Sequence, residues 1–190
     1  MFLNPFGRRD NPFTLVIGMS GVKMGDRMLQ IGCGDAAQLA AVASKVGLSG
    51  RATAVVADAG TGARVEKAAS KAGALIEVLV APPNNLPVEE NAFDLAIIDD
   101  TAAQFTDLNA EQRGAVVRET VRVLRPGGRV MVIGSTPRGG LGAALSRTHA
   151  AHSADPTAAL QSDGYRTVRL LAERDGLVFY EGMKARESKG

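Results

Sequence analysis

The chain has 190 residues, a formal net charge of +2 and 45% hydrophobic residues, values that exclude an intrinsically disordered protein. One cysteine and two histidines exclude a disulfide framework and a cysteine-rich zinc site, so we expect no metal. The basic residues are scattered, tryptophan is absent, and no apolar run reaches the roughly 18 residues that span a bilayer. We therefore expect a cytoplasmic protein with no nucleic-acid partner and no membrane association.

Short apolar segments alternate with helical patterns from residue 27 onward, after an irregular lead and a first apolar segment at 13–18. Helical spacing, capping residues and terminal glycines predict helices at 35–46, 61–72 and 109–124. Nearly all-apolar runs predict strands at 27–31, 52–57, 75–80, 94–98 and 129–133. Apolar strands that alternate with helices indicate a parallel sheet covered on both faces.

The last part of the chain follows a different pattern. Asp155-Pro156 is typical of a helix start, and Gly164 can end that helix. Two further strands are predicted at 166–173 and 177–184, and the Asp175-Gly176 dipeptide between them indicates a hairpin. The expected fold is therefore α/β, Rossmann-like and doubly wound, with a mostly parallel seven-stranded sheet that ends in an antiparallel C-terminal β-hairpin.

Two features at strand ends suggest a ligand site. Gly32-Cys33-Gly34 lies between a strand and a helix, where glycines let backbone N–H groups approach a ligand. Asp58 ends the second strand, 24 residues after Gly34, where a carboxylate can accept hydrogen bonds from ribose hydroxyls. The alternative is a plain tight turn and an aspartate that caps the next helix. Cys33 is interpreted as a small residue that fits between the glycines, not as a nucleophile.

Three longer motifs carry a resemblance to a known family. They are L-x-x-G-x-G at 29–34, L-P-x-x-x-x-F-D at 86–94 and R-V-L-R-P-G-G at 122–128. With them, the chain resembles the class I S-adenosylmethionine-dependent methyltransferases, in particular their small-molecule, methyltransferase-11-like group. The resemblance covers roughly residues 24–134, and the terminal hairpin fits the antiparallel seventh strand of that family.

The resemblance implies S-adenosyl-L-methionine as cofactor and assigns residues to it. The turn at Gly32 would lie against the methionine and ribose, Asp58 would hold the ribose hydroxyls, and Asp99 would face the sulfonium. The implied cofactor-binding set is Gln30, Gly32, Cys33, Gly34, Asp58, Ala59, Ala81, Pro82, Asn84 and Asp99.

Three positions depart from the family pattern. Gln30 stands where the family has an acid that meets the ammonium group of the cofactor, so the charge of that acid is missing. Ala36 replaces a third glycine, and Pro82 stands where an acid usually reads the adenine amino group. A side-chain carbonyl of Asn84 or Asn85 is an alternative reader of the adenine.

Methyl transfer requires mainly that the acceptor is positioned in line with the activated methyl group. A base is needed only where the nucleophile must lose a proton. The candidate catalytic residues are Asp99 and Asp100 at the end of the fourth strand, and His149 and His152 in the Gly/Ala-rich segment 139–154. The alternatives are that the aspartates cap a turn or helix and that the histidines lie in a solvated loop.

The sequence thus predicts one methyltransferase-like domain over residues 1–190. It comprises an N-terminal cap segment at 1–26, a cofactor-binding core at 27–134, and a C-terminal helix and hairpin at 135–190. The expected activity is in-line methyl transfer to a small-molecule acceptor, with a homo-oligomer or a partner subunit as the alternative means of completing the site. The alternative functions are a non-catalytic binding or scaffold protein of this fold and an NAD(P)-dependent oxidoreductase.

Overall fold

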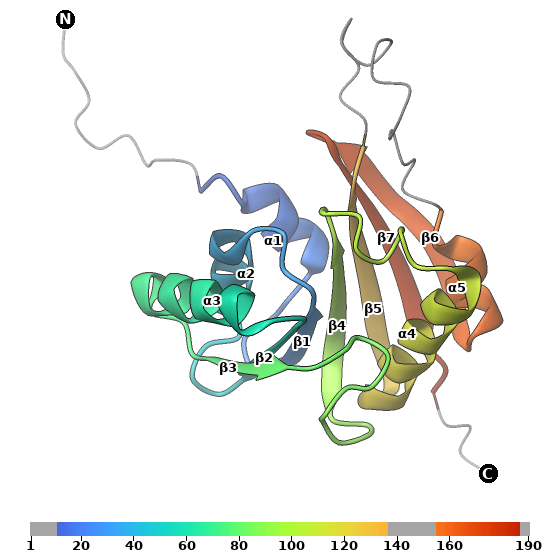
Figure 1. Ribbon diagram of the computed structural model, residues 1–190, viewed down its shortest axis with the longest axis horizontal. Helices are drawn as coiled ribbons and strands as arrows, with labels where there is room; N and C mark the ends of the chain where they lie inside the picture. The colour runs from blue at the N-terminus through green and yellow to red at the C-terminus, as the bar shows by residue number, and fades with distance from the viewer. Residues whose placement is uncertain (1–10, 137–154, 187–190) are drawn as a thin grey trace, which may run out of the picture.

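The computed structural model describes residues 11–136 and 155–186, and within them seven strands form a single sheet (Figure 1). The strands are β1 (Arg27–Ile31), β2 (Arg51–Val56), β3 (Ile76–Val80), β4 (Phe93–Asp100), β5 (Leu124–Ser135), β6 (Tyr165–Arg174) and β7 (Leu177–Lys184). Their order is β3-β2-β1-β4-β5-β7-β6. The first five run parallel, and β7 inserts antiparallel between β5 and β6, which confirms the predicted fold class.

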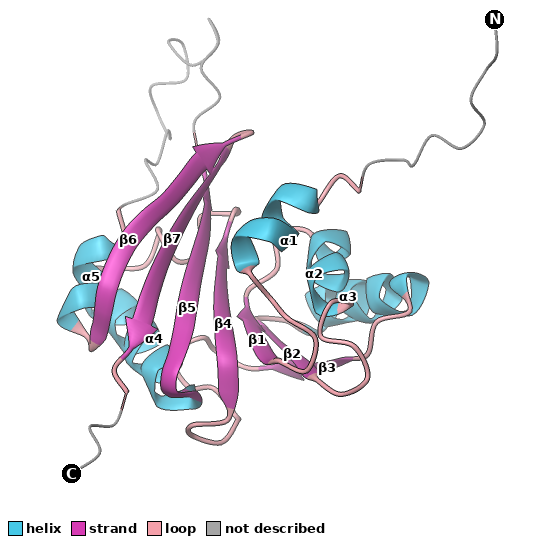
Figure 2. Cartoon of the chain, turned by 180° about the vertical axis from the view of Figure 1, so that it is seen from behind, coloured by secondary structure: helices cyan, strands magenta, loops and turns pink. Residues whose placement is uncertain are grey.

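Five helices of the described residues cover the two faces of this sheet (Figure 2). They are α1 (Thr14–Ser20), α2 (Ala36–Ala43), α3 (Ala59–Ala72), α4 (Ala110–Val123) and α5 (Thr157–Ser162). Leu95 and Ile97 of β4 pack with α1, α2 and α3, whereas Ala96 and Ile98 of the same strand pack with α4 and α5. The apolar strands thus have a helix layer on each side.

Helix ends largely follow the capping residues. Asp35 accepts hydrogen bonds from two amides at the start of α2, and Asn109 forms a capping box with Gln112 at the start of α4. Helix α2 ends at Ala43 and not at residue 46 as predicted, because the amides of Lys45 and Val46 bond three residues back, which tightens the last turn.

The other differences in element bounds lie where packing decides them. The helix predicted at 61–72 begins at Ala59, because Asp58 caps it, and the first apolar segment forms α1. Strand β5 begins at Leu124, before the predicted residue 129. The register against β4 shifts there, so that residues 125–128 bulge out of the pairing.

The parallel strands all end at one edge of the sheet, and the order reverses between β1 and β4, whose loops lead to opposite faces. Ligands of open α/β sheets bind at such a switch point. Within the two described stretches, no helix has the length and apolarity needed to cross a membrane.

Candidate functional site

The turn after β1 is built so that a neighbouring turn can touch its backbone. Gly32 has a φ of +79°, and a Cβ at this position would lie 3.0 Å from the backbone oxygen of Asp99. A Cβ at Gly34 would lie 2.0 Å from Oγ1 of Thr101, which real contacts do not allow. Glycine is therefore required at both positions, because the turn after β4 occupies the space that a side chain would need. At Gly32 the positive φ is a second reason.

Asp99 joins these two turns. Its side chain is buried, and Oδ2 accepts hydrogen bonds from the Gly34 amide at 2.9 Å and from Nε2 of Gln30 at 3.3 Å. Oδ1 accepts from the Thr101 amide at 3.1 Å and from the Thr101 hydroxyl at 2.6 Å. One carboxylate from β4 therefore fixes both the glycine turn of β1 and the first residue of its own turn.

Asp100 is buried as well but holds a different segment. Its Oδ1 accepts hydrogen bonds from the amides of Phe105 at 2.8 Å and Thr106 at 3.0 Å, and its Oδ2 accepts from the Thr106 hydroxyl. The turn at 101–108 is thus folded around this carboxylate. The structure gives both aspartates the capping role that was the alternative to catalysis, and a catalytic role for either stays a prediction.

Asp58 is exposed at the end of β2 and caps α3. Its carboxylate accepts hydrogen bonds from the amide and the hydroxyl of Thr61, both at 2.8 Å. The Thr61 amide, followed by the Thr61 hydroxyl, lowers the pKa of Asp58 below its ordinary value of 3.8. A carboxylate can accept about four hydrogen bonds, so an ionised Asp58 keeps capacity for a ligand.

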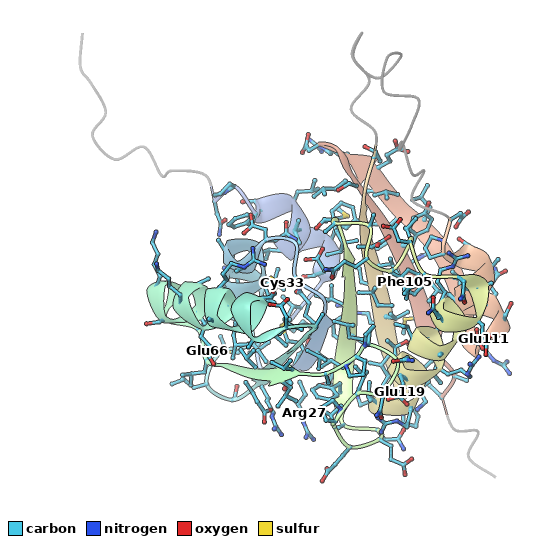
Figure 3. All side chains as sticks on the ribbon, viewed as in Figure 1. Arg27, Cys33, Glu66, Phe105, Glu111 and Glu119 are labelled. Carbon is cyan, nitrogen blue, oxygen red and sulfur yellow. The ribbon has the colours of Figure 1, made fainter. Side chains whose placement is uncertain are left out.

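A cavity of about 230 Å³ lies at the carboxyl edge of the sheet and extends between the strands and α4. It is lined by Ile31, Gly32, Val55, Ala57, Ala81, Pro83, Ile98, Asp99, Gln104, Phe105, Leu108 and Val116. Asp99 and Gln104 contribute the polar side chains of this lining, and the other walls are apolar. Figure 3 shows Cys33 and Phe105 toward this edge and Arg27 at the opposite edge of the sheet.

The structure brings only some of the predicted residues to this cavity. Gly32, Ala81 and Asp99 line it, and Gln30 and Gly34 bond to Asp99 behind it. The remaining predicted residues of the described part, Cys33, Asp58, Ala59, Pro82, Asn84 and Asp100, do not line it. His149 and His152 lie outside the described residues.

Cys33 belongs to the buried core cluster that includes residues of α1, α2 and α3. Its side chain is buried, and burial, together with the charge of Asp99, raises the pKa of the thiol to about 11. The side chain is therefore a protonated thiol at neutral pH, in agreement with its interpretation as a small residue that fits between the glycines.

Sequence reasoning missed the turn at 101–108 as part of the site. Gln104, Phe105 and Leu108 all line the cavity, and the amide oxygen of Gln104 lies 3.4 Å from the position of a Cβ at Gly32. The available signal was a pair of apolar residues in a short segment directly after a strand that ends in two acids.

Comparison with known proteins gives one family and several similar structures. The model of a family described as "Methyltransferase domain" matches residues 29–132. No curated protein matches the sequence.

Among solved structures, a SAM-dependent methyltransferase from Aquifex aeolicus superposes with a TM-score of 0.70 at 19% identity, over 90% of this chain and 89% of that one. The S-adenosylmethionine-dependent methyltransferase SibL in its apo form gives 0.70 at 22% identity, over 92% and 55%. The [4+2]-cyclase SpnF gives 0.64 at 16% identity, over 92% and 80%. At these identities, the similarity shows a shared fold.

Proposed function

The chain belongs to the class I methyltransferase domain family, whose model covers residues 29–132, and from this premise we propose that it transfers a methyl group from S-adenosylmethionine to a small-molecule acceptor. S-adenosylmethionine is the cofactor of this family. The observation that carries the proposal is the cavity at the carboxyl edge, with the glycine turn on one side and the exposed Asp58 carboxylate near the end of β2.

The residues at this edge fit an adenosine ligand. Pockets for whole drug-sized ligands measure roughly 300–1,000 Å³, so a cavity of about 230 Å³ suits one ring system, with the rest of the ligand along the open edge. The apolar walls that Phe105, Leu108 and Ala81 provide suit a purine ring. Asp58, which stays ionised because its pKa is lowered, suits ribose hydroxyls as an acceptor.

When bound, the cofactor supplies a methyl group that its sulfonium already activates. The work left to the protein is to bind and orient, and proximity accounts for most of the acceleration in such a displacement. In this proposal Asp58 fixes the ribose, the glycine turn lets the backbone approach the methionine part, and the turn at 101–108 excludes water from one side of the cofactor.

The surroundings of the two aspartates bear on the acceptor. Asp99 and Asp100 already accept hydrogen bonds from several protein donors, so neither carboxylate is well suited to take a proton from an acceptor. We therefore favour an acceptor that loses no proton to these groups. His149 and His152, in the Gly/Ala-rich segment 139–154, stay as the proposed alternative bases.

A second candidate function is a binding or scaffold protein that keeps the fold without catalysis. Gln30 and Pro82 support it, because both replace acids of the family pattern, and so do the occupied carboxylates at the end of β4. The fold alone does not decide between catalysis of methyl transfer and another function, since a protein of similar fold is named as a cyclase.

Calorimetric titration with S-adenosylmethionine and S-adenosylhomocysteine, after removal of any co-purified ligand, tests the proposal. Binding of both at micromolar concentration, followed by methyl transfer in a screen of small acceptors, is the expected result. Binding without turnover on any acceptor favours the scaffold function. If a folded sample binds neither compound, the proposed function is wrong.

A further inference from the structure

The inference concerns the acid that is missing from the end of β1. Gln30 is buried there, and its amide donates hydrogen bonds to the Gly32 carbonyl and to Oδ2 of Asp99, both at 3.3 Å. In the β1–β4 register, Ile31 pairs with Ile98, so Asp99 comes opposite the start of the glycine turn. A carboxylate thus lies at the same level of the site, one strand away from the position where the family has it.

Asp99 has the surroundings of a carboxylate that organises a turn. Its side chain is 2% exposed, and four protein donors point at it, from Gly34, Gln30 and the amide and hydroxyl of Thr101. Within residues 11–136 and 155–186, no lysine or arginine forms an ion pair with it. A buried charge held only by dipoles is costly, and a cationic ligand at the adjoining cavity would compensate for it.

The chemistry of Gln30 fits a carboxylate at position 99. A carboxylate at position 30 would lie within about 3.3 Å of Asp99, and two carboxylates at that distance cannot both stay ionised. A glutamine instead donates to Asp99 and leaves the site with one negative charge. The amide at position 30 is therefore the complement of the acid at position 99.

We propose that Asp99 supplies, from β4, the carboxylate that the family pattern places at position 30. It holds the glycine turn through the Gly34 amide and provides the negative charge for the cationic methionine end of the cofactor. Gln30 is a positioning residue that orients this carboxylate. The inference rests on the proposed function for its ligand, whereas the contact with Gly34 exists without a ligand.

A charge swap tests the proposal with three variants of nearly unchanged shape: Asp99→Asn, Gln30→Glu, and the two together. Asp94→Asn is the matched control, because Asp94 is a β4 aspartate at the opposite edge that accepts from the Arg27 amide and pairs with Arg125. Affinity for S-adenosylmethionine and S-adenosylhomocysteine is measured by calorimetry. The Gly34 amide resonance is followed by NMR without ligand, and thermal unfolding checks the fold.

Asp99→Asn should weaken binding of both compounds about tenfold or more, since the negative charge beside the cationic methionine end of the ligand is lost. Gln30→Glu should weaken binding as well, because it crowds two carboxylates. The double variant should recover part of the affinity, because the site again carries a single negative charge, although the amide atom that then lies in place of Oδ2 at position 99 can serve either the carboxylate at position 30 or the Gly34 amide and not both. Asp94→Asn should bind as the wild type does. The Gly34 resonance should move in Asp99→Asn, because its carboxylate acceptor is replaced.

Unchanged affinity in Asp99→Asn, or a double variant that binds no better than the single ones, overturns the proposal. If Asp99→Asn fails to fold, Gln30→Glu decides, because it keeps Asp99, and unchanged affinity in this variant overturns the proposal. Failure of the wild type to bind either compound overturns the proposed function instead. In that case, a Gly34 amide resonance that is the same in Asp99→Asn as in the wild type also overturns the role of Asp99 in the turn.

Discussion

The floor and the rim of the site each carry an aspartate at the end of a strand, and the two are built in opposite ways. The floor, residues 30–34 with 99–101, contains Asp99, which is 2% exposed and accepts four hydrogen bonds. The rim, residues 57–61, contains Asp58, which is exposed and bonds only within its own helix start. The same residue type therefore uses its hydrogen bonds to hold the backbone in one place and keeps hydrogen-bonding capacity for a ligand in the other.

The difference follows from packing. At the floor, two turns from strands that are distant in sequence interlock, and a side chain at Gly34 would collide with Thr101. At the rim, the backbone only begins a helix, and the nearest restraint is Thr61. A change at the floor should therefore alter both stability and binding, whereas a change at the rim should alter binding and leave the fold intact.

The largest effect is expected from Gly34→Ala, at the floor. The added methyl would meet Oγ1 of Thr101 at 2.0 Å, and such overpacking typically costs about 1–3 kcal/mol of stability. We also expect cofactor binding to be lost, because the Gly34 amide must move from Asp99. Chemical denaturation and calorimetry measure the two effects.

Two companions make this prediction specific. Thr101→Ala in the Gly34→Ala background should restore part of the stability, because the next nearest atoms, Oδ1 of Asp99 and Cβ of residue 101, both lie 3.4 Å away. Gly18→Ala is the control, since it lies in helix α1, where an added Cβ meets nothing within 4 Å. A Gly34→Ala protein as stable as the wild type would mean that the floor is not interlocked.

A smaller and more selective effect is expected at the rim from Asp58→Asn. Asparagine caps a helix as well as aspartate does, so α3 and the unfolding temperature should be retained. The affinity for S-adenosylhomocysteine should fall about tenfold, because the ribose hydroxyls lose a charged acceptor. Calorimetry and thermal unfolding of the same samples separate the two properties.

The pH dependence of ligand affinity tests the role of Asp58 without a mutation. Because the pKa of Asp58 lies below 3.8, the carboxylate is ionised above that pH. Its contribution to ligand affinity is therefore complete there and is lost only as the pH falls through the lowered pKa. Affinity should therefore be flat from neutral pH down to about pH 4. A loss of stability in Asp58→Asn with unchanged affinity would assign Asp58 to the helix cap alone.

The rim could be predicted from the sequence more fully than the floor. The rim was predictable, because Asp58 and Thr61 interact within one turn of helix and the spacing to Gly34 is a local property of a β–α–β unit. The floor was predictable only as a turn. The bond between Gly34 and Asp99 joins residues 65 apart, and it depends on the β1–β4 register, which the pattern of apolar residues does not give.

The wall at 101–108 shows the same limit. Its path is set by Asp100, whose carboxylate gathers the amides of Phe105 and Thr106 and so turns Phe105 toward the cavity. The sequence shows two acids followed by a short segment of mixed polar and apolar residues, which fits a cap as well as a base. Which donors reach a strand-end acid is decided by tertiary packing, and neighbours in the sequence do not reveal it.

The smallest expected effect on binding concerns Cys33, which lies between the two floor glycines and for which the prediction is one of chemical reactivity. If the floor is closed, alkylation of this thiol at pH 8 should be at least about a hundredfold slower in the folded protein than in the unfolded one, because a pKa of about 11 instead of 9.0 lowers the thiolate fraction by that factor. The same shift adds stability that is complete below pH 9 and declines as the pH rises from 9 to 11, since the unfolded thiol ionises first. S-adenosylhomocysteine should slow alkylation only to the extent that it stabilises the folded protein, and it should not shield the thiol directly. Rapid alkylation that the ligand blocks would instead show that the thiol is accessible from the ligand site. Cys33 would then belong to the open rim and not to the closed floor.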